Sequence, residues 1–280
     1  MASDLETLPV SRDVILYSFP KCGRTWLRYM YMYLYGEHLA ASHLVGIRGP
    51  SKHIILIRRF EDALVSYYFE VVHRAGFGEI DTDGAMKRRW VRAHRGGMLA
   101  LLTLLNRLPI GNTYHRRLGA ASKERSLMAL FRTCVDVFFE HYHLWLTQDG
   151  PKLVLRYEDL KADPVARLRQ LADFVGVTPI VGFAQAAEAA SFENMRALEL
   201  SGRGTQGILR DGYWLPNLTT TDPQNADAHK TREGKVGGHR AHLSEANLRM
   251  IDAYIAEHHA TVAVAYGYRY GVQASLNRPT

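Results

Sequence analysis

The chain has 280 residues, of which 47% are hydrophobic and 22% charged, an ordinary globular balance that excludes a disordered or collagen-like chain. Its formal net charge is +7, and residues 84–125 alone carry +9, so a basic cluster stands in an otherwise nearly neutral chain. The cluster favours an anionic partner, although a solvated helical face gives the same pattern.

No apolar run approaches the ~20 residues that a membrane-spanning helix needs, and no signal-peptide pattern opens the chain. Only two cysteines occur, Cys22 and Cys134, which argues against a disulfide framework and a cysteine-rich zinc site. We therefore expect a cytoplasmic protein with no membrane span.

Short apolar runs alternate with amphipathic stretches along the chain. Strands are predicted at residues 13–18, 53–58 and 152–157, and helices at residues 25–35, 61–72, 126–146 and 164–175. Asp163 is expected to cap the helix that opens on Pro164, and Gly176 to end it. Strands that alternate with helices indicate an α/β fold with a parallel sheet.

The remaining segments predict a single domain over residues 1–280. Residues 76–125, with the apolar run 101–105, are expected to form a helical insertion. Residues 201–224 are rich in glycine and threonine and are expected to form a mobile loop, a lid that orders when a ligand binds. Ser244 is the predicted N-cap of a last helix.

Residues 18–26 (SFPKCGRTW) join the first strand to the first helix. The backbone N–H groups of such a turn, together with a helix N-terminus, form an anion cradle. Lys21 adds a positive charge and Thr25 a hydroxyl. No lysine immediately precedes Thr25, so the Mg²⁺-nucleotide loop G-x-x-x-x-G-K-[ST] is absent and no metal is expected.

Residues 57–68 (IRRFEDALVSYY) end the second strand and open a helix. Arg58 stands at the carboxyl end of that strand, where open α/β sheets bind ligands, and Ser66 follows two helical turns later. A charge that closes an apolar strand needs a partner, which makes Arg58 a candidate for anion binding.

Together the two segments resemble the cytosolic-type sulfotransferases that use 3′-phosphoadenosine 5′-phosphosulfate (PAPS). The first is similar to the family's P-K-S-G-T-T-W loop, with Cys22 and Arg24 as departures, and the second to its R-x₈-S element. Three more matches follow in the family's order. They are residues 156–164 (RYEDLKADP), 191–195 (SFENM) and 232–238 (REGKVGG), the last in a form typical of bacterial members.

The resemblance implies a P-loop NTPase-like three-layer α/β fold, with a central parallel sheet flanked by helices and a helical insertion. It also implies a metal-independent transferase that moves a sulfuryl group from PAPS to a hydroxyl or amine of a small-molecule acceptor. The cofactor site would consist of Lys21, Cys22, Gly23, Arg24, Thr25, Trp26, Arg58, Ser66, Tyr157, Phe192, Met195, Arg232 and Gly234.

Within that site, the Lys21 loop suits the 5′-phosphosulfate, and Arg58, Ser66 and Arg232 would converge on the 3′-phosphate. The Gly234 amide could approach closely because glycine has no side chain. Four further residues would meet the adenine: Trp26, Tyr157, Phe192 and Met195. Without the resemblance, the last three would more often be core residues.

Sulfuryl transfer to an alcohol needs a base, for which the family uses a histidine. His43, in residues 41–44 (ASHL), resembles the family's [ST]-H placement best, and Lys21 would neutralise charge on the leaving group. His38 is the alternative base but could simply cap the first helix, and His53 is expected to pack.

Two other functions compete with this reading. A nucleotide kinase on the same sheet lacks its G-K-[ST] motif here, and a nucleic-acid-binding protein using the basic cluster lacks an interleaved aromatic face. We therefore expect no nucleic-acid partner. The sequence allows a homo-oligomer and predicts none.

Overall fold

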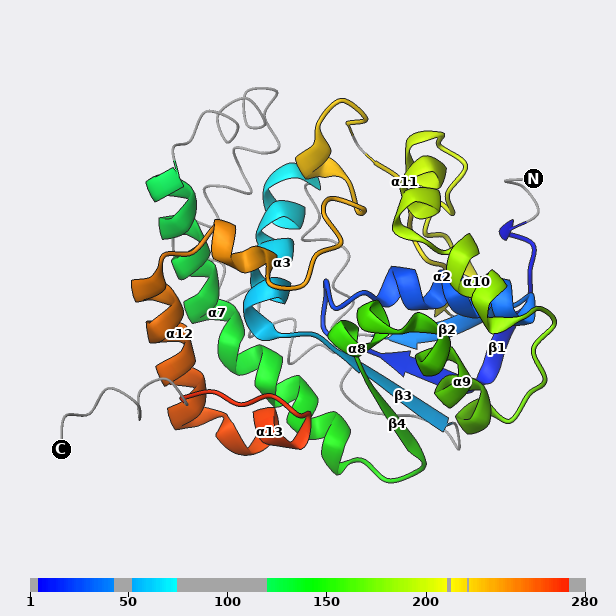
Figure 1. The fold of residues 1–280 in the computed structure, drawn as a ribbon, viewed down its shortest axis with the longest axis horizontal. Helices are drawn as coiled ribbons and strands as arrows, with labels where there is room; N and C mark the ends of the chain where they lie inside the picture. Colours follow the sequence, from blue (N-terminus) through cyan, green and yellow to red (C-terminus); the bar gives the residue numbers. More distant parts are fainter. Residues whose placement is uncertain (1–4, 43–51, 75–119, 211–212, 221, 272–280) are drawn as a thin grey trace. The chain divides into compact units, whose positions relative to one another are not determined.

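The computed structural model describes residues 5–42, 52–74, 120–210, 213–220 and 222–271. The chain divides into two compact units (Figure 1). Unit 1 comprises Met1–Arg58 and Asp149–Val236, and unit 2 comprises Arg59–Gln148 and Gly237–Thr280. A single domain over the whole length stays a prediction.

Unit 1 is built on a four-stranded sheet with strand order β2-β1-β3-β4, in which every neighbouring pair is parallel. The strands are β1 (Val10–Tyr17), β2 (His38–Ser42), β3 (Lys52–Ile57) and β4 (Lys152–Arg156). The predicted α/β class with a parallel sheet is confirmed, and the three predicted strands shift only at their ends.

The central strands are apolar on both faces, as is typical of parallel sheets. Leu16 of β1 and Ile54 of β3 join the helix-side core, whereas their neighbours Ile15 and Ile55 point to the opposite face and are also buried. This two-sided burial explains why these strands read as continuous hydrophobic runs in the sequence.

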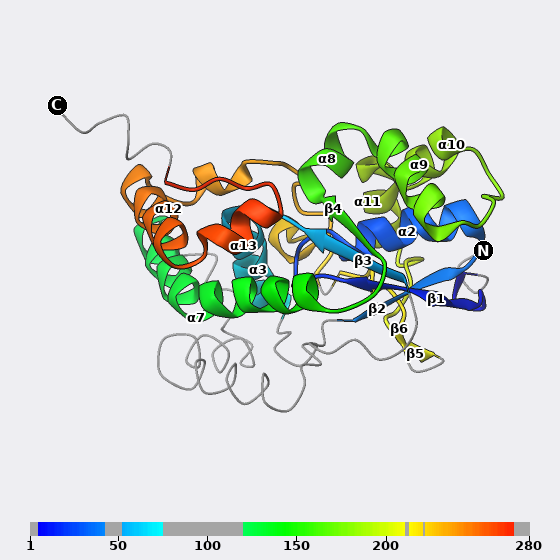
Figure 2. The same ribbon diagram turned by 90° about the horizontal axis from the view of Figure 1, so that it is seen from below.

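The helices of unit 1 lie on one side of the sheet, and a short hairpin lies on the other (Figure 2). The helices are α2 (Arg24–Tyr35), α8 (Tyr157–Ala162), α9 (Pro164–Val175), α10 (Phe183–Ala189) and α11 (Phe192–Leu200), and a 3₁₀ turn, η2, spans Ala226–Ala228. The predicted boundaries of α9 are confirmed: the Asp163 carboxylate accepts from the Ala166 N–H, and Gly176 ends the helix in the left-handed region.

Two sequence predictions in unit 1 are wrong at element boundaries. His38 does not cap the first helix: α2 ends at Tyr35 with a left-handed Gly36, and His38 opens β2, a strand too short and too rich in alanine to be recognised. Tyr157 does not end a strand but opens α8, because Arg156 makes a bidentate pair with Asp159 and stabilises the helix start.

The predicted mobile loop at residues 201–224 contains a hairpin of β5 (Leu209–Arg210) and β6 (Tyr213–Trp214). Its first residues are fixed to α2, because the Thr205 N–H donates to the Tyr29 hydroxyl at 2.9 Å. Leu215 and Leu218 are buried. The mobility of this segment stays a prediction.

Unit 2 is helical in its described residues. Its elements are α3 (Phe60–Arg74), α7 (Ala120–Thr147), the 3₁₀ turn η3 (Gly238–Ala241), α12 (Glu245–His258) and α13 (Ala260–Ala265). Ser244 caps α12 as predicted, by accepting from the Asn247 N–H, but α12 is not the last helix, since α13 follows it. Phe60 of α3 contacts Phe131 and Phe138 of α7 edge-on and forms part of the core.

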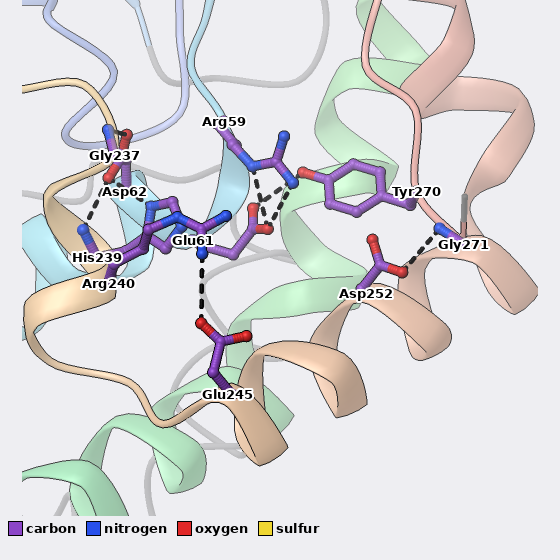
Figure 3. Close-up of polar contacts among 10 residues, drawn as sticks. All are labelled: Arg59, Glu61, Asp62, Gly237, His239, Arg240, Glu245, Asp252, Tyr270 and Gly271. Carbon is purple, nitrogen blue, oxygen red and sulfur yellow. Dashed lines mark hydrogen bonds and ion pairs between the residues drawn. The ribbon is translucent and has the colours of Figure 1, made fainter. Parts of the chain in front are cut away.

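The first turn of α3 organises the polar contacts of unit 2 (Figure 3). The buried Glu61 carboxylate accepts from the Arg59 guanidinium at 3.1 Å and from the Tyr270 hydroxyl at 3.0 Å. Arg59 also lies over the Tyr270 ring. These contacts hold Tyr270 at the start of α3.

The predicted helical insertion and most of the basic cluster lie outside the described residues, apart from residues 120–125, which open α7. Across the parts of the chain that the structure describes, no helix combines the length and apolarity needed to cross a bilayer.

Candidate functional site

The loop between β1 and α2 presents an uncapped helix N-terminus. Lys21 at φ 69° and Gly23 at φ 95° both adopt left-handed backbone, which turns the chain sharply into the helix. Gly23 caps α2 without a side-chain hydrogen bond, and the first turn holds no acidic residue. Backbone N–H groups and the positive end of the helix dipole are thus available to an anion beside Lys21.

Arg58 follows β3 and is held by neutral groups. Its guanidinium donates to the Lys21 carbonyl at 3.3 Å and to the Lys235 carbonyl at 2.9 Å, and it lies 4.4 Å from the centroid of the Tyr157 ring. Its buried Nε has no hydrogen-bond partner among the described residues. Arg58 therefore ties the loop at Lys21 to the turn at Lys235 without using its charge on a carboxylate.

The turn at residues 232–236 supplies a second guanidinium. The Arg232 side chain is 14% exposed and forms an ion pair with the neighbouring Glu233. Gly234 adopts φ +60°, and a Cβ there would come within 2.6 Å of the Phe192 ring. The turn thus needs glycine both for its backbone conformation and for close contact with α11.

The two guanidiniums lie close enough to act on each other. Burial lowers the pKa of Arg232, the carboxylates of Glu233 and Asp227 raise it, and the charge of Arg58 lowers it again. Two neighbouring cations repel each other, and an anion bound to both would relieve that repulsion. The structure therefore brings Arg58 close to Arg232 and Gly234, and their binding of one phosphate stays a prediction.

Aromatic residues from three helices meet beside the loop. Trp26 of α2 donates from its indole N–H to the Ala190 carbonyl at 2.7 Å and contacts the Tyr157 ring edge-on at 5.7 Å. The Lys161 ammonium lies over both the Trp26 and the Phe192 rings. The Tyr157 ring in turn packs against Gly23, where a Cβ would be 2.6 Å away.

The remaining predicted site residues differ in exposure. Cys22 is fully buried, whereas Arg24 and Thr25, in the first turn of α2, are half-buried. Met195 of α11 is buried and belongs to the hydrophobic core. Ser66 is half-buried on α3 in unit 2 and so belongs to the other unit.

Of the three histidines considered as a base, His43 lies outside the described residues. His38 is fully buried, and its Nε2 donates to the Leu5 carbonyl at 2.7 Å. His53 is also buried and contacts the Tyr17 ring edge-on, as predicted for a packing residue. Both described histidines are therefore packing residues of the sheet.

The sequence analysis did not single out Glu199, which is 1% exposed at the end of α11. Its carboxylate accepts from the backbone N–H groups of Lys230 and Thr231 at 2.7 and 2.9 Å, and from the Thr231 hydroxyl at 2.6 Å. It thereby fixes the two residues that precede Arg232. A glutamate in the last turn of a helix, where it opposes the dipole, was the available signal.

Asp62, on α3 in unit 2, was also missed. Its carboxylate accepts from the Gly237 N–H at 2.7 Å, and from the His239 N–H and Nδ1 at 3.0 and 2.7 Å (Figure 3). It fixes the residues that follow the turn. No group of three or more histidine, cysteine or acidic side chains arranged to bind a metal occurs among the described residues.

Comparison with known proteins identifies the architecture. A family model described as a sulfotransferase domain matches residues 37–262, a range that begins after the β1–α2 loop. The crystal structure of mouse sulfotransferase SULT7A1 complexed with PAP is similar with a TM-score of 0.55 and 16% identity, covering 95% of this chain and 92% of that one.

A second similar structure is retinol dehydratase in complex with androsterone and inactive cofactor PAP. It gives a TM-score of 0.51 and 16% identity, over 96% of this chain and 86% of that one. Among curated protein sequences, the comparison found no match. The two structural similarities establish the fold, an α/β sheet flanked by helices.

Proposed function

Because the chain belongs to the sulfotransferase family, as the match over residues 37–262 shows, we propose that it transfers a sulfuryl group from PAPS to a hydroxyl or amine of a small-molecule acceptor. The observation that carries the choice of donor is the approach of Arg58 to Arg232, close to the anion-binding loop at Lys21. PAPS has two separate anionic ends. Unit 1 offers Lys21 for the 5′ end and the pair of Arg58 and Arg232 for the 3′ end.

The residues present fit the donor at its 5′ end. The α2 N-terminus has no side-chain cap and no acid in its first turn, so its N–H groups suit the oxygens of a phosphosulfate. Lys21 adds a full positive charge at the same place. Tyr157 keeps Gly23 in position by packing against it, so the loop is already shaped before any ligand binds.

The 3′ end fits Arg58, Arg232 and Gly234. Arg58 has a buried Nε without a partner among the described residues, and Gly234 lets the turn adopt a left-handed backbone in close contact with Phe192. Trp26, Tyr157 and Phe192 offer aromatic surface to the adenine. Met195 contributes from the core side, and Ser66 is assigned to the 3′-phosphate by the resemblance alone.

Bound PAPS would supply the sulfuryl group, which the acceptor oxygen or nitrogen attacks in line. In this proposal His43 accepts the proton that the acceptor loses, and Lys21 stabilises the charge that develops on the departing oxygen. The buried packing of His38 favours His43 over it as the base. The chemistry needs positioning and charge stabilisation only, so we propose that it is metal-independent.

The acceptor is proposed to be a small molecule. One structural neighbour holds androsterone, a small-molecule ligand, which is consistent with that class. In this chain we expect the acceptor to contact residues between His73 and His143, of which 75–119 lie outside the described residues.

Thermal unfolding with nucleotides tests the donor assignment. Adenosine 3′,5′-bisphosphate should raise the melting temperature clearly more than ATP at equal concentration, because only the former carries a 3′-phosphate for Arg58 and Arg232. Equal stabilisation by both would contradict the two-phosphate site and favour a nucleotide kinase.

Turnover tests the reaction itself. Incubation with sulfur-labelled PAPS and a panel of alcohols, phenols, amines and glycans should label at least one acceptor. The variant His43→Ala should then lose about 10²–10⁴-fold in kcat while it still binds the bisphosphate. Unchanged turnover in this variant would exclude His43 as the base.

A further inference from the structure

The Glu199 carboxylate is a buried charge that the proposed chemistry does not use. It is 1% exposed and lies in the last turn of α11, where the negative end of the helix dipole disfavours it. Burying a carboxylate is costly unless hydrogen bonds compensate it. Three donors provide that compensation here, and all three belong to Lys230 and Thr231.

These two residues directly precede Arg232. Both of their backbone N–H groups point to the same carboxylate, so the chain direction at the entry to the turn is set by Glu199. A two-oxygen acceptor that receives two adjacent N–H groups fixes orientation as well as position. The direction in which Arg232 leaves the chain is therefore decided on α11.

The same helix contacts the turn at its other end. Phe192, seven residues before Glu199, packs so closely on Gly234 that a Cβ would meet its ring at 2.6 Å. Seven residues of α-helix span about 10 Å. Helix α11 thus contacts the turn both before and after Arg232, so the helix and the turn form one structural body.

We propose that Glu199 is a positioning residue for recognition of the 3′-phosphate, an inference that rests on the proposed function. It holds residues 230 and 231 on α11, so that the adenine-facing Phe192 and the phosphate-facing Arg232 keep a fixed separation. The ribose joins base and 3′-phosphate through few rotatable bonds, so their spacing varies over a narrow range, and a matching fixed spacing in the protein lowers the cost of binding.

The contacts favour positioning over a direct charge effect. The carboxylates of Glu233 and Asp227 raise the pKa of Arg232. Both Glu199 oxygens are instead occupied by the three donors of Lys230 and Thr231. Glu199 therefore acts on Arg232 through the two residues that precede it.

The test compares two ligands that differ only in the 3′-phosphate: adenosine 3′,5′-bisphosphate and adenosine 5′-phosphate. Isothermal titration calorimetry gives a dissociation constant for each, and their ratio measures 3′-phosphate recognition. In Glu199→Gln the ratio should fall about tenfold, because a charge-assisted contact is lost, whereas the affinity for adenosine 5′-phosphate should stay within about twofold. Glu193→Gln, the same change at an exposed position of α11, should leave the ratio unchanged.

A purely structural role for Glu199 would lower the melting temperature and leave the ratio as in the wild type, which would overturn the proposal. If Glu199→Gln does not fold, Thr231→Val removes only the hydroxyl donor and should lower the ratio about two- to threefold; no change there would equally overturn it. A wild-type protein that binds both ligands equally would instead refute the proposed 3′-phosphate site itself, and this inference with it.

Discussion

In the proposed site Arg58 and Arg232 bind the same phosphate, yet their surroundings differ. Arg58 is held by the carbonyls of Lys21 and Lys235 and by the face of Tyr157, all of them neutral groups. Arg232 is held by the carboxylate of Glu233. The geometry of Arg58 is fixed, and none of these described partners carries a charge to balance its own, whereas the charge of Arg232 is partly balanced by Glu233.

This difference predicts unequal contributions to binding. An anion that binds Arg58 meets a guanidinium already held in place by its neighbours, and it does not have to displace a carboxylate. An anion that reaches Arg232 must compete with Glu233, whose attraction offsets part of the gain. We therefore expect most of the 3′-phosphate affinity to come from Arg58, and the affinity due to Arg232 to depend on residue 233.

The largest expected effect is that of Arg58→Ala. This change should cost about 2–4 kcal/mol of binding of adenosine 3′,5′-bisphosphate, because it removes a charged contact and releases both the Lys21 and the Lys235 carbonyls. Calorimetry measures it, with Arg169→Ala, an exposed arginine on α9, as the control. A loss no greater than that of Arg232→Ala would contradict the comparison.

Gly234→Ala should have the next largest effect, since it alters only the Arg232 side. A left-handed φ and the contact with Phe192 both oppose a Cβ, so we expect a loss of about 1–3 kcal/mol in bisphosphate binding. Adding Phe192→Leu would remove the steric part and should recover some affinity. Binding by Gly234→Ala at wild-type strength would mean that the turn plays no part in phosphate recognition.

Glu233→Lys should tighten bisphosphate binding by about 1 kcal/mol, because it removes the competitor of Arg232 and adds a cation at a partly exposed site. Glu233→Gln should give a smaller gain of the same sign. The gain of Glu233→Gln, which adds no cation, should vanish in the Arg232→Ala background, which a double-mutant cycle measures. A gain that persists there would show that residue 233 acts on the phosphate independently of Arg232.

Removal of divalent metal ions by a chelator should have the smallest effect: we expect the turnover rate to stay unchanged within error. In the proposed mechanism Lys21 supplies the positive charge that Mg²⁺ provides in nucleotide enzymes with a lysine–hydroxyl pair. Turnover of labelled PAPS in excess EDTA checks this expectation. A loss of activity that added Mg²⁺ restores would show that Lys21 is not sufficient.

The sequence predicts the parts of the site that are encoded locally. The loop at Lys21, the strand end at Arg58 and the glycine turn at Gly234 each combine a charge or a glycine with a recognisable neighbouring element, and the structure brings them into one unit. The sheet is predictable for the same reason, because two-sided burial leaves continuous apolar runs.

The residues that hold the site residues in place could not be predicted in this way. Glu199 is 31 and 32 residues from its partners, and Asp62 is 175 and 177 residues from its own. Both bind backbone N–H groups, which every residue except proline carries, so the partners leave no trace in the sequence. Strand β2 was missed because its five residues, HLAAS, lack a clear apolar pattern.

Each unit contains one buried cysteine, whose reaction with a thiol reagent reports local opening of that unit. Cys22 is 0% exposed in the loop before α2, and Cys134 is 1% exposed within α7, where burial raises its pKa to about 12. A thiol reagent can reach either sulfur only while the surrounding structure is transiently open. The labelling rate at Cys22 therefore reports how often the loop opens, and the rate at Cys134 reports how often unit 2 opens around α7. A ligand bound to the loop should lower the labelling rate at Cys22 and leave that at Cys134 unchanged, so that Cys134 serves as an internal control.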